Sequence, residues 1–591
     1  MRTLLCLSLA VLTCFAQSRT TRPVLRGREY AVTSMKPEAT QVTERILRAG
    51  GNAFDAAVAG QAVLGLVDAA NNGIGADAQL LLWDARAKKA VSLNAEGTAP
   101  RLATIEWYRA NQGGKIPVGD TLLSGTVPGV VDAWYILLDR WGTMTFEQTL
   151  APAIEMAERG FPLNNQLASA IANSKKLRRY PSSARAYFPG GTSPKRGEIA
   201  TYPDLARTMR KLVEAERAAA PQGRRAALKA ARDRFYKGDI AREMARFSEE
   251  NGGLVRYEDF AAYTAKVEEP VSADYRGYTM LKNPSSGQGP AELFALNILE
   301  TYDLRALGHN TAEYIHAGVE AVKLAFADRD KYLGDMDFIQ IPYPGLLSKE
   351  YARERRKLID GAKASLEYRP GVPEKYMGIA PLDRPSDINW PGDKNDGGDT
   401  SYLAVVDKDR NIVSFTPSLH TGFGTTIVMG TLGFTFNCRG DYYSLVPGHA
   451  NALEPGRRPR STLQSTLVLK DGAPMLVTGS PGGDDQCMRT MQTFLNIVEF
   501  GMNPQQAIEA PRWSTRSFPQ STFPHSMYPG EMSVEDRIPV AVREALIARG
   551  HKLKVTGPWS LGNNGAIQLD PQTGVLSAAA DPRCDAYALA W

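Results

Sequence analysis

The chain has 591 residues, of which 43% are hydrophobic and 23% charged, and its formal net charge is +5. This composition is typical of a globular protein, and the length exceeds what a single hydrophobic core usually serves. Because the charge excess is small and no long basic run stands out, the sequence gives no reason to propose nucleic acid as a partner.

The first 16 residues are predicted to be a secretory signal. Arg2 supplies the positive end, residues 4–15 are apolar, and Ala16 is a small residue before a cut at Gln17. The apolar run is too short to span a bilayer, and no later stretch is long enough. We therefore expect an exported protein, periplasmic or extracellular, without a membrane span. A lipoprotein site at Cys14 is the alternative, although Thr13 is unfavourable there.

The following segments show the apolar spacing of helices and strands. Residues 53–67 are rich in Ala, Val and Leu, so we expect this helix to pack closely on a sheet. The other predicted helices are 38–49, 130–140 and 312–331, residues 205–248 are predicted to be helical and are heavily charged, and a strand is predicted at 78–83.

The sequence changes character abruptly at Thr400. Residues 365–399 are punctuated by Pro, Gly and Asp and form the clearest flexible segment. Beyond Thr400, residues 402–406 and 412–415 are predicted strands joined by a polar turn. A cut of the Asp399–Thr400 bond would leave Thr400 with a nucleophilic hydroxyl and an α-amine, whose reference pKa is about 7.7–8. That pair is a known form of activated nucleophile. The alternative is that Thr400 only opens a hairpin.

A second hairpin precedes a glycine-rich turn. Residues 466–469 and 475–478 flank the sequence Lys-Asp-Gly-Ala, which is a strong turn signal. The second strand leads into Gly479-Ser480-Pro481-Gly482-Gly483. Backbone N–H groups at such a strand end can form an oxyanion hole, and a plain turn is the alternative.

Cysteine and histidine spacing favours neither a metal nor a cofactor. Cys438, Cys487 and Cys584 follow the signal, without a CxxC pair. A Cys438–Cys487 disulfide is one option in an oxidising compartment. The six histidines show no HExxH or paired spacing, so no metal site and no cofactor are predicted.

Several fragments, in order along the chain, resemble the γ-glutamyltranspeptidase family of N-terminal-nucleophile hydrolases. They run from about residue 31 to 591. They include Arg45-Ile46-Leu47-Arg48-Ala49-Gly50-Gly51-Asn52-Ala53-Phe54-Asp55, Ser124-Gly125-Thr126-Val127-Pro128-Gly129, Ala325-Phe326-Ala327-Asp328-Arg329, Gly479-Ser480-Pro481-Gly482-Gly483 and Ala510-Pro511-Arg512-Trp513.

The resemblance implies an α+β fold, a four-layer αββα sandwich. It also implies one precursor that cuts itself into a large subunit, 17–399, and a small subunit, 400–591, forming one intertwined body. Thr400 would attack the substrate amide, Ser418 would hydrogen-bond the nucleophile, and Gly482 and Gly483 would stabilise the oxyanion. Water or an acceptor amine would release the acyl group.

The glutamate pocket departs from the family pattern. Glu96 stands where the family has an arginine for the substrate carboxylate, and Tyr442 where it has an acid for the amino group. Asp441 directly precedes Tyr442. His420 replaces an asparagine and Arg439 a glutamine, while the pair Ser461-Thr462 matches the family. An arginine facing the carboxylate gives a bidentate contact that Glu96 cannot give, although Arg439 could supply a relocated positive charge.

The predicted function is therefore a self-processing amide hydrolase or acyltransferase acting on γ-glutamyl amides such as glutathione. Two alternatives stay open. One is an acylase for another amide, as in the related cephalosporin acylases. The other is a catalytically silent binding protein on the same scaffold.

Overall fold

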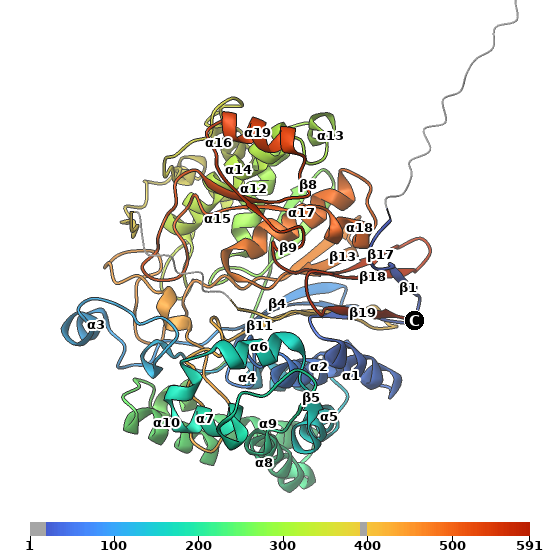
Figure 1. Ribbon diagram of the computed structural model, residues 1–591, viewed down its shortest axis with the longest axis vertical. Helices are drawn as coiled ribbons and strands as arrows, with labels where there is room; N and C mark the ends of the chain where they lie inside the picture. Colours follow the sequence, from blue (N-terminus) through green and yellow to red (C-terminus); the bar gives the residue numbers. More distant parts are fainter. Residues whose placement is uncertain (1–18, 391–398) are drawn as a thin grey trace, which may run out of the picture.

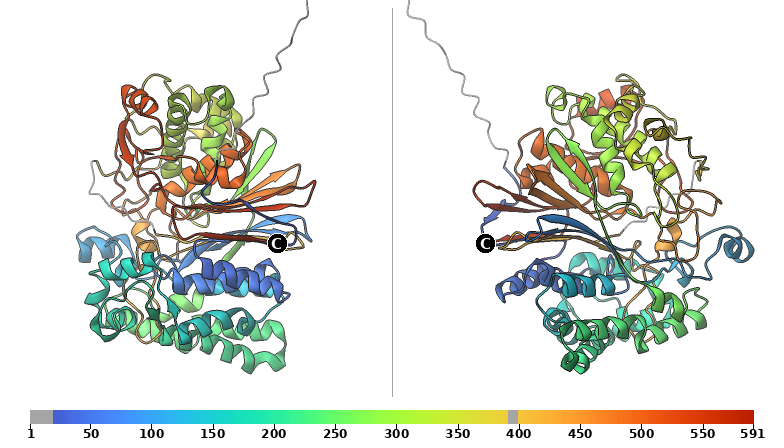
Figure 2. Two further views of the ribbon diagram at one scale, coloured as in Figure 1. Left: turned by 45° about the vertical axis from the view of Figure 1, so that its right-hand side comes forward. Right: turned by 180° about the vertical axis from the view of Figure 1, so that it is seen from behind.

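The computed structural model describes residues 19–390 and 399–591. The predicted signal, 1–16, and residues 391–398 of the predicted flexible segment lie outside the described residues. Within the described part, two seven-stranded antiparallel sheets lie face to face between two helical layers (Figures 1 and 2). The predicted four-layer αββα sandwich is confirmed.

One sheet carries the strand that follows Thr400. Its order is β19-β2-β10-β11-β3-β4-β7. The bounds are β19 Tyr587–Ala590, β2 Ala31–Ser34, β10 Leu403–Val406, β11 Ile412–Ser418, β3 Asp77–Asp84, β4 Lys89–Ala95 and β7 Lys266–Glu268. Strands from before and after Thr400 are hydrogen-bonded side by side here, so the two predicted subunits share one sheet.

The other sheet has the order β1-β18-β17-β13-β12-β9-β8. Its bounds are β1 Leu25–Gly27, β18 Leu576–Ala580, β17 Gly565–Leu569, β13 Ala473–Gly479, β12 Thr466–Lys470, β9 Tyr278–Lys282 and β8 Val271–Tyr275. The predicted hairpin is β12–β13, which pairs Thr466 with Thr478.

The side chains of β10 explain why its sequence is apolar throughout. Leu403 and Val405 belong to the core under one helical layer. Ala404 and Val406 belong to the core between the sheets. Successive side chains of a strand point to opposite faces, so a strand that is buried on both faces reads as a continuous apolar run.

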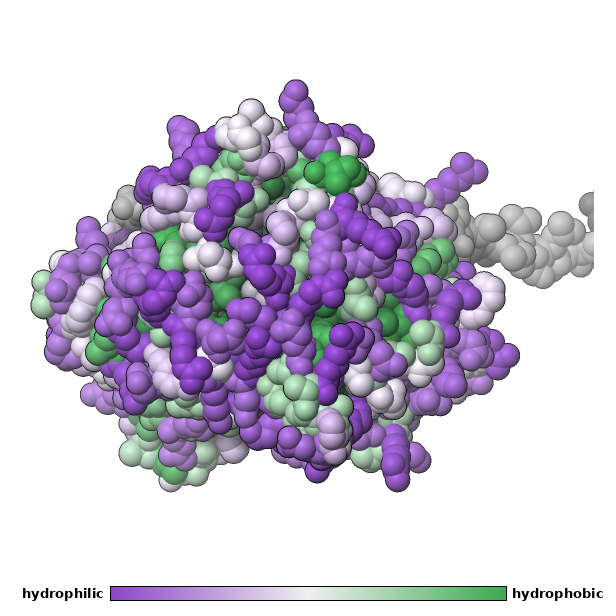
Figure 3. Space-filling model, turned by 90° about the horizontal axis from the view of Figure 1, so that it is seen from below, coloured by the Kyte–Doolittle hydropathy of each residue, from purple (hydrophilic) through white to green (hydrophobic). Residues whose placement is uncertain are grey.

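The first helical layer covers the β10 sheet. Its helices are α1 Pro37–Arg48, α2 Ala53–Val67, α4 Val130–Arg140, α5 Phe146–Arg159, α6 Asn165–Asn173, α7 Pro181–Tyr187, α8 Pro203–Ala219, α9 Arg224–Tyr236, α10 Asp239–Glu250 and α11 Tyr257–Ala262. Helix α3, Ile105–Gln112, lies beside a smaller core. The outer face of this layer, seen from below, is mainly hydrophilic with small separate hydrophobic patches (Figure 3), as expected where helices meet solvent.

Helix α2 fixes the position of the β10–β11 hairpin. Asn52 and Asp55 form a capping box at its N-terminus. The Ala53 N–H donates to the Asp407 carboxylate, in the turn between the two strands, at 2.9 Å. A Cβ on Gly60 would lie 2.1 Å from the Thr43 hydroxyl and 3.0 Å from Leu403. Glycine therefore lets α2 approach α1 and β10 closely.

The second helical layer covers the other sheet. Its helices are α12 Gly289–Leu299, α13 Leu304–Leu307, α14 Ala312–Tyr332, α15 Tyr343–Leu346, α16 Lys349–Arg356, α17 Gln486–Val498, α18 Pro504–Glu509 and α19 Val540–Ala548. A small sheet, β14 Trp513–Thr515, β15 Glu531–Glu535 and β16 Lys552–Thr556, accompanies them. Helix α14 is buried along nearly its whole length.

Candidate active site

Several polar residues meet at one end of the β10 sheet. The register pairs Ser418, the last residue of β11, with Asp77, the first of β3. Ala95 ends β4 opposite Ala78, so Glu96 follows at the same end. Thr400 lies at the same end, because β10 begins shortly after Thr400 and pairs with β11.

The Ser418 hydroxyl lies between Thr400 and the bond before it. The Thr400 hydroxyl donates to Ser418 Oγ at 3.2 Å. Ser418 Oγ in turn donates to the carbonyl oxygen of Asp399 at 2.7 Å. Thr400 is 4% exposed and Ser418 fully buried. Together we call Asp399, Thr400 and Ser418 the cleavage centre.

The backbone of His420 holds this centre in place. Its N–H donates to Ser418 Oγ at 2.8 Å, and its carbonyl accepts from the Asp399 N–H. Its φ of +83° is in the left-handed region, which is uncommon for a residue other than glycine. Residues held in such conformations cluster at functional sites. The sequence did not reveal this role of the main chain.

The glycine-rich turn lies at the end of β13, next to β10. A Cβ on Gly479 would overlap the ring of Tyr402, two residues beyond Thr400. Gly482 and Gly483 have φ of +104° and +59° and border a cavity of about 330 Å³ that Arg489 also lines. A side chain at either glycine would be strained.

Beyond the cleavage centre, the residues that the sequence predicts for the substrate pocket lie in what we call the buried polar cluster, where most polar groups are hydrogen-bonded or ion-paired to one another. Glu96 accepts hydrogen bonds from the hydroxyls of Ser286 and Ser461. Tyr442 and Thr462 share a hydrogen bond of 3.0 Å between their hydroxyls. All the members are at most 1% exposed. They are Asp77, Glu96, Ser286, His420, Arg439, Asp441, Tyr442, Ser461 and Thr462.

Arg439 is the cation of this cluster. Its Nε and Nη2 donate to the two oxygens of Asp77 at 3.0 and 2.9 Å. Its guanidinium also lies over the ring of Tyr442, 5.1 Å from the centroid. Nη1 has no hydrogen-bond partner among the described residues. Arg439 therefore keeps one donor for a further acceptor, although Asp77 neutralises its charge.

The side chain of His420 belongs to the cluster, while its backbone contacts the cleavage centre. Its Nε2 lies 2.6 Å from an oxygen of Asp441. The ring centroids of His420 and Tyr442 are 4.3 Å apart. Neither carboxylate oxygen of Asp441 makes a well-aligned hydrogen bond among the described residues.

Burial and the neighbouring Asp77 carboxylate raise the pKa of Glu96 to about 7. The two serine hydroxyls and Arg439 act in the opposite direction. Removal of water disfavours the charged form of a carboxyl group. Glu96 is therefore a buried member of the site and not a surface acid.

The sequence identified most of these residues but missed two partners. Asp77 and Ser286 were not singled out, because a lone acid at a strand start and a serine in a turn carry no distinctive spacing. The thiols of Cys438, Cys487 and Cys584 are free, so the suggested Cys438–Cys487 disulfide is wrong. Burial raises the pKa of Cys438 to about 12.

The sandwich, with a threonine at the start of a core strand, has the architecture of N-terminal-nucleophile hydrolases. The family model described as gamma-glutamyltranspeptidase matches residues 39–591. The chain belongs to the γ-glutamyltranspeptidase family. It is an enzyme of the class in which an N-terminal threonine is the nucleophile for cleavage of amide bonds.

Individual relatives cover nearly the whole chain. A "Glutathione hydrolase-like YwrD proenzyme" of Bacillus subtilis is 33% identical over 95% of this chain and 98% of its own. A "Glutathione hydrolase proenzyme" of Escherichia coli is 33% identical over 95% of this chain and 91% of its own. The crystal structure of a cephalosporin acylase from Bacillus halodurans matches with a TM-score of 0.84, at 33% identity, over 97% and 98% of the two chains. Among the described residues, no helix has the length and apolarity needed to cross a membrane.

Proposed function

We propose that Thr400 is the nucleophile, first in self-cleavage of the Asp399–Thr400 bond and then toward an amide substrate. The observation that carries the proposal is the pair of hydrogen bonds through Ser418, from the Thr400 hydroxyl and to the Asp399 carbonyl. The family assignment supports it independently.

The two hydrogen bonds suggest how the proton moves during self-cleavage. As Thr400 Oγ1 attacks the Asp399 carbonyl carbon, its proton passes to Ser418, and the Ser418 proton passes to the carbonyl oxygen. The C–N bond then breaks, the Thr400 nitrogen takes a proton, and an ester remains. Water hydrolyses the ester, which leaves a carboxylate on Asp399 and a free amine and hydroxyl on Thr400. That amine then serves as the base in substrate acylation.

In this proposal the subunits are 17–399 and 400–591. The oxyanion of the acyl transfer would be held by the backbone of Gly482 and Gly483. A signal of residues 1–16 would direct the precursor to a periplasmic or extracellular location, which cell fractionation tests.

The substrate we propose is a γ-glutamyl amide of the glutathione type. Arg439 Nη1 is the donor available for the α-carboxylate, in place of the arginine missing at position 96. Asp441, whose carboxylate oxygens make no well-aligned hydrogen bond among the described residues, would accept from the α-ammonium group. The rest of the proposed substrate pocket would be lined by Glu96, His420, Tyr442, Ser461 and Thr462. Water or an amine would accept the acyl group.

The experiment has two parts. The purified protein should give two fragments, and the smaller should begin at Thr400 by N-terminal sequencing. Thr400→Ala should remain one chain and lose activity by about 10⁶-fold, as nucleophile removal does in other hydrolases. A small fragment that begins elsewhere contradicts the proposal. Thr400→Ser keeps a hydroxyl and is the matched control.

A second candidate substrate class is an amide whose acyl group lacks the amino group. Tyr442 favours it, since it replaces the acid with which the family holds the amino group, and so does the likeness to a cephalosporin acylase. A γ-glutamyl anilide and the matching glutaryl anilide differ only in the α-ammonium. A higher kcat/KM for the glutaryl compound would select this class, and a higher value for the γ-glutamyl compound would select the first.

A further inference from the structure

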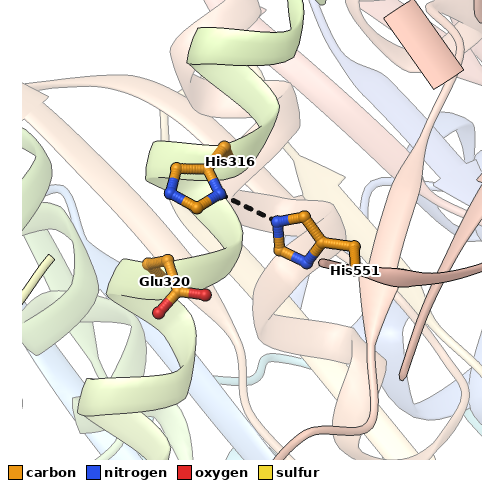
Figure 4. Close-up of side chains that lie close together, drawn as sticks. All are labelled: His316, Glu320 and His551. Atoms are coloured by element: carbon orange, nitrogen blue, oxygen red, sulfur yellow. Dashed lines mark hydrogen bonds between the residues drawn. The ribbon is translucent and has the colours of Figure 1, made fainter. Parts of the chain in front are cut away.

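A buried cluster of potential metal ligands lies in the second helical layer, apart from the proposed catalytic site. His316 and Glu320 are one turn apart on α14, and His551 directly precedes β16 (Figure 4). His316 is 2% exposed, Glu320 1% and His551 3%. One ligand atom from each lies within 4.8 Å of the other two. No sequence motif revealed the cluster, because 235 positions separate the two histidines.

The hydrogen bonds of His316 define which nitrogen faces the cluster. Nε2 lies 2.8 Å from the carbonyl oxygen of Asp360, which can only accept, so Nε2 carries a proton. In the neutral ring Nδ1 then presents a lone pair toward His551 Nε2, 2.8 Å away. A ring nitrogen that donates to a backbone carbonyl while the other faces inward is the usual arrangement of a metal-ligating histidine.

The other ring has an unexplained polar atom. His551 Nδ1 is buried and has no hydrogen-bond partner among the described residues. Contact with His316 alone therefore leaves this imidazole half satisfied, which is unusual for a buried polar group. The one hydrogen bond between the two rings thus leaves His551 Nδ1 unexplained.

We propose that His316, Glu320 and His551 bind one divalent transition-metal ion, for which Zn²⁺ is the best match. Two imidazole nitrogens and a carboxylate oxygen are typical Zn²⁺ ligands, whereas Mg²⁺ and Ca²⁺ prefer oxygen alone. At Zn–N distances of about 2.0–2.1 Å and a tetrahedral angle, the two nitrogens lie about 3.3 Å apart. The rings need to separate by about half an ångström.

Turning to the ion would cost Glu320 the hydrogen bond from the Ser365 N–H at 3.3 Å, whereas its two cationic partners keep other acceptors. Lys323 donates to Glu320 but also to the carbonyl oxygen of Ser365. Arg369 donates to Glu320 through one nitrogen and to the Leu358 carbonyl through another. These cations weaken the attraction for a metal ion, so we expect a lower affinity than that of a site without neighbouring positive charge.

The site joins the two sides of the proposed cut. His316 and Glu320 precede Thr400, and His551 follows it. A bound ion would therefore connect the large and small subunits after maturation. Only this consequence, and not the metal site, rests on the proposed self-cleavage.

The test uses the purified wild-type protein, dialysed against a chelator and then supplied with Zn²⁺ or Co²⁺ alone. We expect one equivalent of bound metal by elemental analysis and a visible absorption band for the Co²⁺ form. At about one hundred times Kd, Zn²⁺ should raise Tm by about 2 °C. Wild-type protein that binds no stoichiometric metal and shows no Co²⁺ band overturns the proposal.

Two variants locate the site. His551→Gln should lose the bound equivalent and the Tm shift. His309→Gln should keep both, because His309 packs against Phe500, outside the cluster. Retention of the metal by His551→Gln overturns the assignment. If His551→Gln does not fold, Glu320→Gln takes its place with the same expected loss of metal. Wild-type stoichiometry alone would not distinguish this site from a second buried group of potential ligands, His420, Cys438 and Asp441.

Discussion

The cleavage centre and the buried polar cluster lie side by side but use their polar groups differently. In the cleavage centre, the Ser418 hydroxyl is hydrogen-bonded to both groups that would react, the Thr400 hydroxyl and the Asp399 carbonyl oxygen. In the cluster, charges are turned mainly toward one another, as Arg439 is toward Asp77. The first arrangement suits cleavage of the Asp399–Thr400 bond, whereas the second suits the shaping of the proposed substrate pocket.

This difference implies that self-cleavage and substrate recognition can change independently. We expect replacements in the cluster to leave the Ser418 contacts in place, because those contacts involve the backbone of His420 and not its side chain. Acyl specificity could then change while the proposed self-cleavage is kept. Variants that affect one region and spare the other test this separation.

The largest effect on stability is expected from breaking the buried ion pair. Asp77→Asn keeps the size of the side chain but leaves the Arg439 charge uncompensated, which typically costs about 3–5 kcal/mol. Urea unfolding in the uncleaved Thr400→Ala background measures it on a single chain. The double variant Asp77→Asn with Arg439→Met should recover part of the loss. Equal stability of the single and double variants would show that the charge is already neutralised elsewhere.

A smaller effect is expected on the rate of self-cleavage. Ser418→Ala removes the donor to the Asp399 carbonyl, and the loss of one such donor typically slows a reaction by about 10²–10³-fold. Ser418→Thr keeps the hydroxyl and should cleave much faster than Ser418→Ala. The appearance of the small fragment with time, followed by gel electrophoresis, gives the rates.

Tyr442→Phe is the matched control for that experiment. Its hydroxyl contacts Thr462 within the cluster and takes no part in the Ser418 contacts. Its self-cleavage should equal that of the wild type, even where its activity toward substrate changes. If Tyr442→Phe slows cleavage as much as Ser418→Ala does, the two regions are not separate.

The fold and most site residues were predictable, and the exceptions have physical reasons. Residues 53–67 and 130–140 were predicted as helices with their observed bounds, because their apolar pattern and flanking glycine or asparagine are local signals. The Thr400 junction was visible as a change from polar to apolar residues. Two partners in the cluster were not predictable, Ser286 for Glu96 and Asp77 for Arg439. Each comes close to its partner only because of the tertiary fold.

The histidines illustrate the same limit. His316 and His551 show no spacing that links them, and only the packing of α14 against the chain before β16 brings their rings together. A free cysteine and a disulfide cysteine also look alike in the sequence. Cys438 and Cys487 belong to different surroundings, beside Thr421 and Gln288.

The smallest effect concerns the pH dependence of stability that Glu96 gives to the cluster. Burial raises the pKa of this carboxyl from 4.5 to about 7 in the folded protein, so folding favours its protonated form. That contribution is fully present below about pH 4.5 and is lost as the pH rises through 7. Glu96→Gln resembles the protonated form, so its advantage over the wild type should be near zero at pH 4.5.

At pH 8 the advantage of Glu96→Gln should reach up to about 3 kcal/mol, since each pKa unit corresponds to about 1.4 kcal/mol. Urea unfolding between pH 4.5 and 8, again in the Thr400→Ala background, measures the difference. In the Thr400-containing protein, Glu96→Gln should leave the rate of self-cleavage unchanged, because Glu96 contacts Ser286 and Ser461 and not Ser418. A stability difference that does not change with pH would mean that Glu96 is ionised throughout, and that Arg439 or the two serine hydroxyls outweigh its burial.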